Sequence, residues 1–202
     1  MLILASASPR RRNLLQEMGF EFEVQPANIE EQALPGEAPV DFVRRLAREK
    51  AEAVAESARQ GPRRFVLGSD TVVVLDGLVL GKPSSPEEAV EMLTRLTGRT
   101  HSVMTGIAVA DARRGTMLDR VVESQVEMRE AHLQEIQAYV DTGEGLDKAG
   151  AYALQGEGRR FVTAVLGSES NVIGLPLEET WALLDRAAQD AHGHEADTAR
   201  ET

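Results

Sequence analysis

The segment that most constrains this chain is an apolar run, Leu2 to Ala5, followed at once by Ser6-Ala7-Ser8-Pro9-Arg10-Arg11. The run predicts a buried strand, and serine followed by proline is favoured where a helix begins. A strand that turns directly into a helix presents free backbone N–H groups and the positive end of the helix dipole to an anion. Arginines on the first helical turn oppose that dipole, so they favour a functional role, and guanidinium groups suit phosphate.

The overall charge makes this basic cluster a local feature. The 202 residues carry a formal net charge of −11, which argues against general binding to nucleic acid or to anionic membranes. The chain has no cysteine, which excludes disulfides and thiolate chemistry. The first predicted strand begins at residue 2 and leaves no room for a signal peptide, and no apolar run approaches the roughly 18 residues of a membrane span. We therefore expect a cytoplasmic protein.

Strand and helix patterns alternate along the rest of the chain. Strands are predicted at 20–24, 65–67, 71–75, 78–80, 103–110, 121–128 and 161–166, and helices at 9–18, 39–54, 86–97, 133–142 and from 177 onward. The Asp76-Gly77 turn joins two strands in a hairpin, so the sheet is predicted to be mixed rather than all parallel. We expect one domain, residues 1–188, followed by a disordered acidic tail at 189–202.

Asp70 is the strongest candidate for chemistry in the middle of the chain. The apolar strand pattern is interrupted by Gly68-Ser69-Asp70-Thr71. A carboxylate inside an apolar strand is costly unless it is paired or bound to a metal. The residues alone leave three roles open for Asp70: an aspartate that caps its own turn, a ligand for a divalent cation, or a general base.

Three other positions carry weaker signals. Glu31 follows another glutamate in the loop after the second strand, and this pair is either a metal or water site or a solvated acidic loop. Lys82 is held between a glycine and a proline, and it either contacts a ligand or is solvated. The long loop at 144–160 contains Gln155, whose amide has the donor and the acceptor needed to read a base edge.

Seven short segments of the chain match one protein family in the same order. The segments are Ser6–Arg11, Glu30–Glu31, Leu46–Ala51, Gly68–Thr71, Gly81–Pro83, Asp147–Tyr152 with Gln155–Gly156, and Gly174–Leu177. Together they resemble the Maf family of nucleoside triphosphate pyrophosphatases. A single segment would be a weak signal, whereas seven in register across most of the chain are a strong one.

The resemblance implies an α/β fold with a mixed twisted sheet in two lobes around a cleft, similar to the inosine triphosphate pyrophosphatases (the Maf/Ham1 fold). It implies hydrolysis of a nucleoside triphosphate to the monophosphate and pyrophosphate, with a divalent cation such as Mg²⁺, Mn²⁺ or Co²⁺. Such an enzyme cleans nucleotide pools, with a link to arrest of cell division. A homodimer is a further expectation from the family.

The resemblance also implies roles for individual residues. Asp70, Glu31 and Lys82 match catalytic positions, and Asp70 and Glu31 match the ligands of the divalent cation. The substrate-binding residues that it implies are Ser6, Ser8, Arg10, Arg11, Lys50, Thr71, Lys148 and Gln155.

Three of these positions separate substrate classes within the family. Arg10, Thr71 and Gln155 look like the dTTP/UTP class, whereas the 7-methyl-GTP class would carry an aromatic residue and a glutamine at the first two. The alternatives are therefore a 7-methyl-GTP pyrophosphatase and a nucleotide-binding regulator without turnover. One departure from the family pattern is Glu169, where an aromatic residue is usual.

Overall fold

The structure is a computed structural model that describes the backbone of residues 1–198 and the side chains of residues 1–191. Within these residues the strands form one sheet in the order β2-β1-β3-β5-β6-β7, with β4 paired to β3. β1 pairs in parallel with β2 and β3, and the other pairs are antiparallel, so the predicted mixed α/β sheet is confirmed. The strands are β1 (Leu2–Leu4), β2 (Phe22–Val24), β3 (Phe65–Leu75), β4 (Leu78–Leu80), β5 (Thr100–Asp111), β6 (Thr116–Met128) and β7 (Val162–Leu166).

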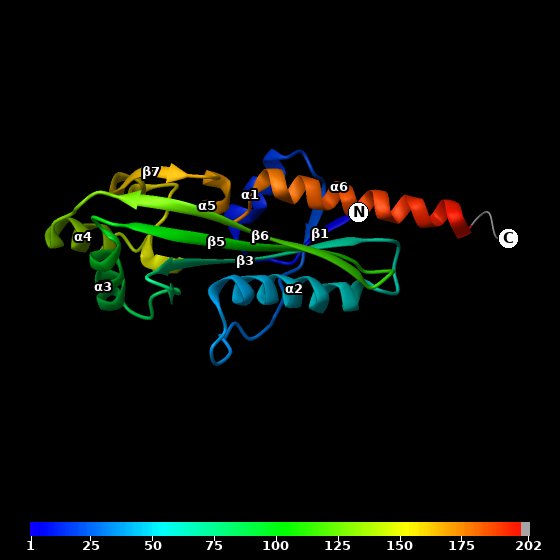
Figure 1. Cartoon of the computed structure of the whole chain (residues 1–202), viewed down its shortest axis with the longest axis horizontal. Coiled ribbons are helices and arrows are strands. Elements are labelled where there is room, and N and C mark those ends of the chain that lie inside the picture. The colour runs from blue at the N-terminus through cyan, green and yellow to red at the C-terminus, as the bar shows by residue number, and fades with distance from the viewer. Residues whose placement is uncertain (199–202) are drawn as a thin grey trace.

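Helices lie on both sides of this sheet (Figure 1). α2 packs on β3 and β5 from one side, and α6 packs on β5 and β6 from the other, near α1. None of the helices in the described residues is long and apolar enough to cross a bilayer. The helices are α1 (Pro9–Glu17), α2 (Pro39–Ala58), α3 (Pro86–Leu96), α4 (Leu133–Val140), α5 (Glu169–Ile173) and α6 (Leu177–Thr198), with 3₁₀ turns η1 (Ala149–Ala151) and η2 (Glu157–Phe161).

β3 runs without interruption, although the sequence predicted a break at residues 68–70. A Cβ on Gly68 would lie 2.1 Å from the carbonyl oxygen of Ala47 in α2. A Cβ on Gly106, which faces Asp70 across the β3–β5 ladder, would lie 2.2 Å from the carbonyl oxygen of Val43. Both glycines therefore allow α2 to approach the sheet closely, and neither breaks a strand. This approach brings the α2 backbone next to the strand at Asp70.

The core consists of four clusters of buried apolar side chains, and β3 contributes to each of them. One cluster lies under α3, α4 and the loop that follows α4. The others lie beneath α1 and α6 and beneath α2. Asp70, midway along β3, is therefore held by a strand that is packed on both faces along its length. Such a strand fixes the direction of its side chains, which a catalytic group requires.

The end of α6 differs from the predicted disordered tail. Residues 189–198 continue the helix, and residues 199–202 lie outside the described residues. Nη1 of Arg114 donates to the carbonyl of Asp190 at 2.9 Å, and Nη1 of Arg63 donates to the carbonyl of Ala191 at 3.3 Å. Ala187 and Ala191, one turn apart, are buried. Alanine is the strongest helix former and buries a small face, which a search for large apolar residues overlooks.

Candidate active site

Lys50, Asp70 and Glu31 form a compact charged cluster. α2 supplies Lys50, β3 supplies Asp70, and the loop between β2 and α2 supplies Glu31. Nζ of Lys50 lies 2.7 Å from Oδ1 of Asp70 and 2.6 Å from Oε1 of Glu31. The Lys50 and Asp70 side chains are only 7% and 10% exposed, whereas that of Glu31 is 47% exposed. A buried ammonium group therefore bridges two carboxylates from distant segments, and the capping role for Asp70 that the sequence left open is not the one observed.

The positive charges around Glu31 keep its carboxyl group ionised. Partial burial alone would raise the pKa of Glu31. The hydrogen bond from Lys50, together with the charges of Lys50, Lys82 and Arg11, outweighs that effect, so the pKa of Glu31 lies below its ordinary value. The positive charges of Lys82 and Arg11 therefore act on the same cluster.

Arg11 ties the start of α1 to the centre of the sheet. Its Nε donates to the carbonyl of Gly174 at 2.9 Å, Nη1 to Oγ of Ser6 at 3.3 Å, and Nη2 to Oγ1 of Thr71 at 3.1 Å. Burial lowers the pKa of Arg11, and the negative charge of Asp70 opposes that shift. A guanidinium with every nitrogen bonded to the protein is a fixed positive charge beside the helix start.

The two predicted serines build the turn that precedes α1. Oγ of Ser8 accepts from the backbone N–H of Arg11 at 3.4 Å, which confirms Ser8 as the N-cap, and Pro9 begins the helix. Oγ of the buried Ser6 accepts from the N–H of Ser8 at 3.2 Å, in addition to its bond from Arg11. The hydroxyl groups therefore shape the strand–turn–helix junction that the sequence singled out as an anion site.

Gly174 and Thr105 belong to the site although the sequence analysis did not predict them. The carbonyl of Gly174 accepts from Oγ of Ser69 at 3.2 Å as well as from Arg11. Thr105 donates to the carbonyl of Asn171 at 3.0 Å, so the 2.9 Å contact between the Thr71 and Thr105 hydroxyls has Thr71 as donor. The φ of Gly174 is 128°, a value that favours glycine, and the sequence placed Gly174 only within a segment that matches the family, without a role. No pattern marks one threonine in a strand.

Lys148 lies in the loop that follows α4, and Arg10 lies near that loop. Nζ of Lys148 donates to the carbonyl of Glu144 at 2.5 Å and pairs with the carboxylate of Asp147. Burial alone would raise the pKa of Asp147, but the bond and charge of Lys148 and the charge of Arg10 lower it. Arg10 is therefore near this loop, and Lys148 is bonded within it.

Glu144 organises the segment that carries Gln155. Its carboxylate accepts from the Tyr139 hydroxyl at 3.1 Å and from the backbone N–H groups of Glu157 and Gly158 at 2.9 and 3.0 Å. These bonds hold the residues just after Gln155, whose own side chain is exposed. In the part of the chain that the structure describes, Gln155 makes no hydrogen bond to the other predicted site residues.

Asp70 and Glu31 have the chemistry that a hard divalent cation requires. Mg²⁺ prefers oxygen ligands and is commonly held by one or two carboxylates, with water and substrate phosphates completing its shell. The two carboxylates already share one ammonium group, so they converge on one position. Groups of three or more acidic or histidine side chains suited to a metal do not occur among the described residues. The donor set therefore fits a cation that is bound together with a phosphate ligand.

Residues 1–187 of this chain match the sequence pattern of a family described as "Maf-like protein". The chain belongs to the Maf family. Curated relatives of this Maf-like chain include a dTTP/UTP pyrophosphatase of Anaeromyxobacter dehalogenans (strain 2CP-C), 53% identical over 92% of this chain and 93% of the relative. Proteins of the same name from Myxococcus xanthus and Escherichia coli O157:H7 are 51% and 48% identical. They cover 93% and 95% of this chain, and 92% and 98% of their own lengths are matched.

Solved structures similar to this Maf-like chain are more distant. A nucleoside-triphosphatase (dITP/XTP pyrophosphatase) from Mycobacterium abscessus aligns over 63% of this chain and 73% of its own, at 15% identity and a TM-score of 0.39.

Glu169, the position that departs from the family pattern, makes its ion pair at the surface. Glu169 begins α5 and pairs with Arg159 at 3.0 Å, and both side chains are more than half exposed. This ion pair therefore lies on the surface, outside the buried bonds of Arg11.

Proposed function

We propose that this chain hydrolyses dTTP and UTP to the monophosphate and pyrophosphate. The observation that carries the proposal is the buried bridge from Lys50 to Asp70 and Glu31 beside the fixed charge of Arg11. It combines carboxylates suited to a cation and a water molecule with positive groups suited to a triphosphate. The names of relatives that are about half identical over more than nine-tenths of the chain support the choice of substrate.

The chemistry that we propose is attack of water on the α-phosphorus. Asp70 takes a proton from that water, an oxygen–phosphorus bond forms, and the bond from the α-phosphorus to the bridging oxygen of the β-phosphate breaks. Pyrophosphate is then the leaving group. Lys50 holds Oδ1 of Asp70 and so orients the base. Arg11, Lys82 and the start of α1 stabilise the negative charge of the phosphates.

Asp70 and Glu31 would hold the divalent cation, Mg²⁺, Mn²⁺ or Co²⁺. When bound, the cation supplies positive charge to the phosphate oxygens and acts as a Lewis acid. Lys50 makes both carboxylates converge and thereby prepares the ligands before the substrate arrives. Lys148 is assigned to substrate binding through the loop that it stabilises.

The base preference that we propose depends on Arg10 and Gln155. The amide of Gln155 offers one donor and one acceptor to a uracil-type edge, and Arg10 supplies a planar cation near base or phosphate. Thr71 acts through Arg11, because its hydroxyl accepts from Nη2 of Arg11. A glutamine at position 71, as in the 7-methyl-GTP class, would remove that hydroxyl. This bond is a physical reason to prefer the pyrimidine class.

The remaining proposals concern the setting of the reaction. We propose that the enzyme acts in the cytoplasm on free nucleotides, as a homodimer, without nucleic acid or membrane partners. The net charge of −11 supports the last point, because anionic polymers and surfaces repel such a chain. Light scattering of the purified protein measures the oligomeric state directly.

A nucleotide panel tests the function. Pyrophosphate release is measured with UTP, dTTP, CTP, GTP and 7-methyl-GTP, in Mg²⁺ or Mn²⁺ and again with a chelator. We expect metal-dependent pyrophosphate from UTP and dTTP with the highest kcat/KM. Orthophosphate and a diphosphate as products would contradict cleavage at the α-phosphorus. A preference for 7-methyl-GTP would assign the other class, and binding without turnover would favour a regulator.

A further inference from the structure

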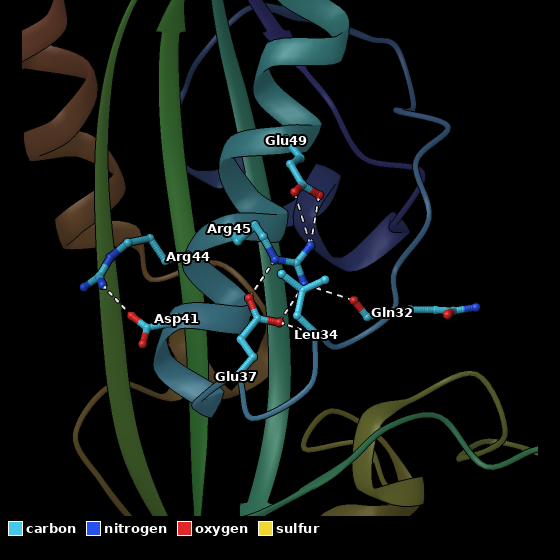
Figure 2. A network of polar contacts seen from close by, with 7 residues as sticks. All are labelled: Gln32, Leu34, Glu37, Asp41, Arg44, Arg45 and Glu49. Carbon is cyan, nitrogen blue, oxygen red and sulfur yellow. Dashed lines mark hydrogen bonds and ion pairs between the residues drawn. The ribbon is translucent and has the colours of Figure 1, made fainter.

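Arg45 of α2 is bonded through every nitrogen of its guanidinium group (Figure 2). Nε and Nη2 donate to the two carboxylate oxygens of Glu37 at 2.6 and 2.7 Å. Nη1 lies 3.2 Å from both carboxylate oxygens of Glu49, one helical turn further on. Nη2 also donates to the backbone carbonyl of Gln32 at 2.9 Å. One side chain therefore joins α2 to the loop that precedes it at two separate points.

The loop segment bound by Arg45 is closed on itself. The carboxylate of Glu37 accepts from the N–H of Leu34 at 3.0 Å, and the N–H of Glu37 donates to the carbonyl of Leu34 at 3.0 Å. The hydrogen bond from Arg45 lowers the pKa of Glu37 to about 2, so the pair stays ionised over the working range of pH. Figure 2 shows the Gln32 side chain extending away from the network. The contact at residue 32 therefore uses only the main chain.

Glu31 immediately precedes this anchored carbonyl. Its carboxylate is held by Lys50 at 2.6 Å, and the backbone one residue further on is held by Arg45. We propose that Arg45 is a positioning residue, which sets the Glu31 carboxylate for the divalent cation. This proposal rests on the proposed function. Both anchors, Lys50 and Arg45, lie on α2, so the loop is fixed to the same helix that faces Asp70.

The loop has little else to hold it. Residues 30–36 are exposed, and Leu34, the large apolar side chain in this segment, is 55% exposed. A segment with few buried apolar contacts opens locally at low cost, so polar anchors decide its position. Arginine suits this role because its planar fork binds a carboxylate with two parallel bonds and has a donor left for the carbonyl. Lysine keeps the charge but lacks the fork.

The neighbouring arginine provides a matched control. Nη1 of Arg44 lies 3.2 Å from Asp41 in the same helix, and its Nε lies 3.3 Å from Asp119 of β6. Figure 2 shows Arg44 pointing away from the loop. Arg44→Lys therefore perturbs ion pairs on the same helix, whereas Arg45→Lys perturbs the loop anchor.

Cation binding is the first measurement. Mn²⁺ is titrated by electron paramagnetic resonance in the presence of α,β-methylene-UTP, which is not cleaved between the α- and β-phosphorus. Partners that orient metal ligands typically contribute 10–100-fold in metal affinity. We expect Arg45→Lys to weaken Mn²⁺ binding about tenfold, and Arg44→Lys to stay within about twofold of the parent chain. Saturating Mn²⁺ should restore most of kcat in Arg45→Lys.

Amide hydrogen exchange over residues 29–36 is the second measurement, and it does not depend on turnover. Arg45→Lys should speed exchange of this segment, while Arg44→Lys should not. Equal Mn²⁺ affinity in the two variants would overturn the proposal, whether or not the loop exchanges faster. A parent chain that binds Mn²⁺ with the analogue but releases no pyrophosphate from UTP would contradict the proposed function alone, because the comparison of variants would remain valid.

Discussion

The cluster around Lys50 and Arg11 and the loop around Gln155 are built in different ways. The cluster is assembled from segments far apart in the chain: Arg11 bonds to Gly174, and Lys50 bonds to Glu31 and Asp70. Its central side chains are buried against a continuous strand. In the loop, the carboxylate of Glu144 bonds to near neighbours, residues 151–154 are buried, and the side chain of Gln155 is exposed. The groups proposed for chemistry are therefore held by bonds between distant segments, whereas the side chain proposed for base recognition, Gln155, is exposed at the edge of a packed loop.

The loop is also attached to the rest of the domain through buried contacts. Nε2 of His101 in β5 lies 2.8 Å from the hydroxyl of Tyr152, which follows η1. Their rings meet edge to face at 5.5 Å between centroids. The N–H of Gly150 also donates to the carbonyl of Gly81 at 3.1 Å, and Tyr152 packs in the core cluster under α3 and α4, so this part of the loop is fixed while the side chain of Gln155 stays exposed. The comparison thus predicts that substitutions in the cluster affect all substrates, and that substitutions in the loop act selectively.

The largest expected effect is that of Asp70→Asn on the cluster. Asparagine keeps the shape but removes the charge and the basicity. We expect kcat to fall by about 100-fold or more for every nucleotide, which corresponds to about 2.7 kcal/mol of lost transition-state stabilisation. Steady-state pyrophosphate release measures kcat, and circular dichroism checks that the variant is folded.

Glu30→Gln is the matched control for Asp70→Asn. Glu30 is an exposed carboxylate next to Glu31, and its loss should leave kcat within about twofold. Near-normal turnover by Asp70→Asn would remove Asp70 from the mechanism. A loss confined to one nucleotide would erase the contrast between the two regions.

The sequence predicted the elements of this fold well where a local signal existed. Ser8 caps a helix whose first residue is proline, as the sequence indicated. The Asp76-Gly77 turn also joins β3 to β4 as predicted. Gly68 was misinterpreted as a strand break because its cause, the carbonyl of Ala47, comes from a segment distant in sequence. The close approach of a helix to a strand produces no hydrophobic periodicity in the sequence of either element.

Site residues follow the same division. The family resemblance, and not any local pattern, pointed to Lys50, because a lysine in a long helix is ordinarily solvated. The acceptor at Gly174 is a backbone carbonyl, so no side chain marks it in the sequence. Arg45 is one of several charged residues on α2, and nothing in the sequence distinguishes it from the others. Where a function depends on a backbone group or on a charge whose partner is distant in sequence, only the assembled structure displays it.

A second effect concerns stability, through the attachment of the loop at low pH. Burial lowers the pKa of His101 to about 4, against about 6.5 in the unfolded chain. Between these values the unfolded chain binds a proton that the folded chain does not, so stability falls as pH decreases from about 6.5 to about 4. The slope from this group is at most about 1.4 kcal/mol per pH unit, or about 3 kcal/mol in total. Urea unfolding at several pH values measures it.

His101→Gln should flatten this pH dependence, because glutamine does not titrate. His132→Gln is the control for the substitution itself, since His132 is an exposed histidine just before α4. An identical slope in the parent chain and in His101→Gln would mean that the histidine is not buried neutral. The bond between His101 and Tyr152 would then not be a neutral buried attachment of the loop.

The smallest expected effect is also the most selective, and it comes from Gln155→Ala. An amide that pairs with a base edge at an exposed position contributes near the lower end of about 1–3 kcal/mol, so kcat/KM for UTP and dTTP should fall by about fivefold to tenfold. The values for GTP should change little, because the cluster of Lys50 and Arg11 is untouched. Gln137→Ala is the matched control, since Gln137 is an exposed glutamine on α4 bonded to Asp141 at 2.9 Å. An equal loss for all nucleotides would show that Gln155 supports the cluster and does not read the base, and the two regions would then act as one.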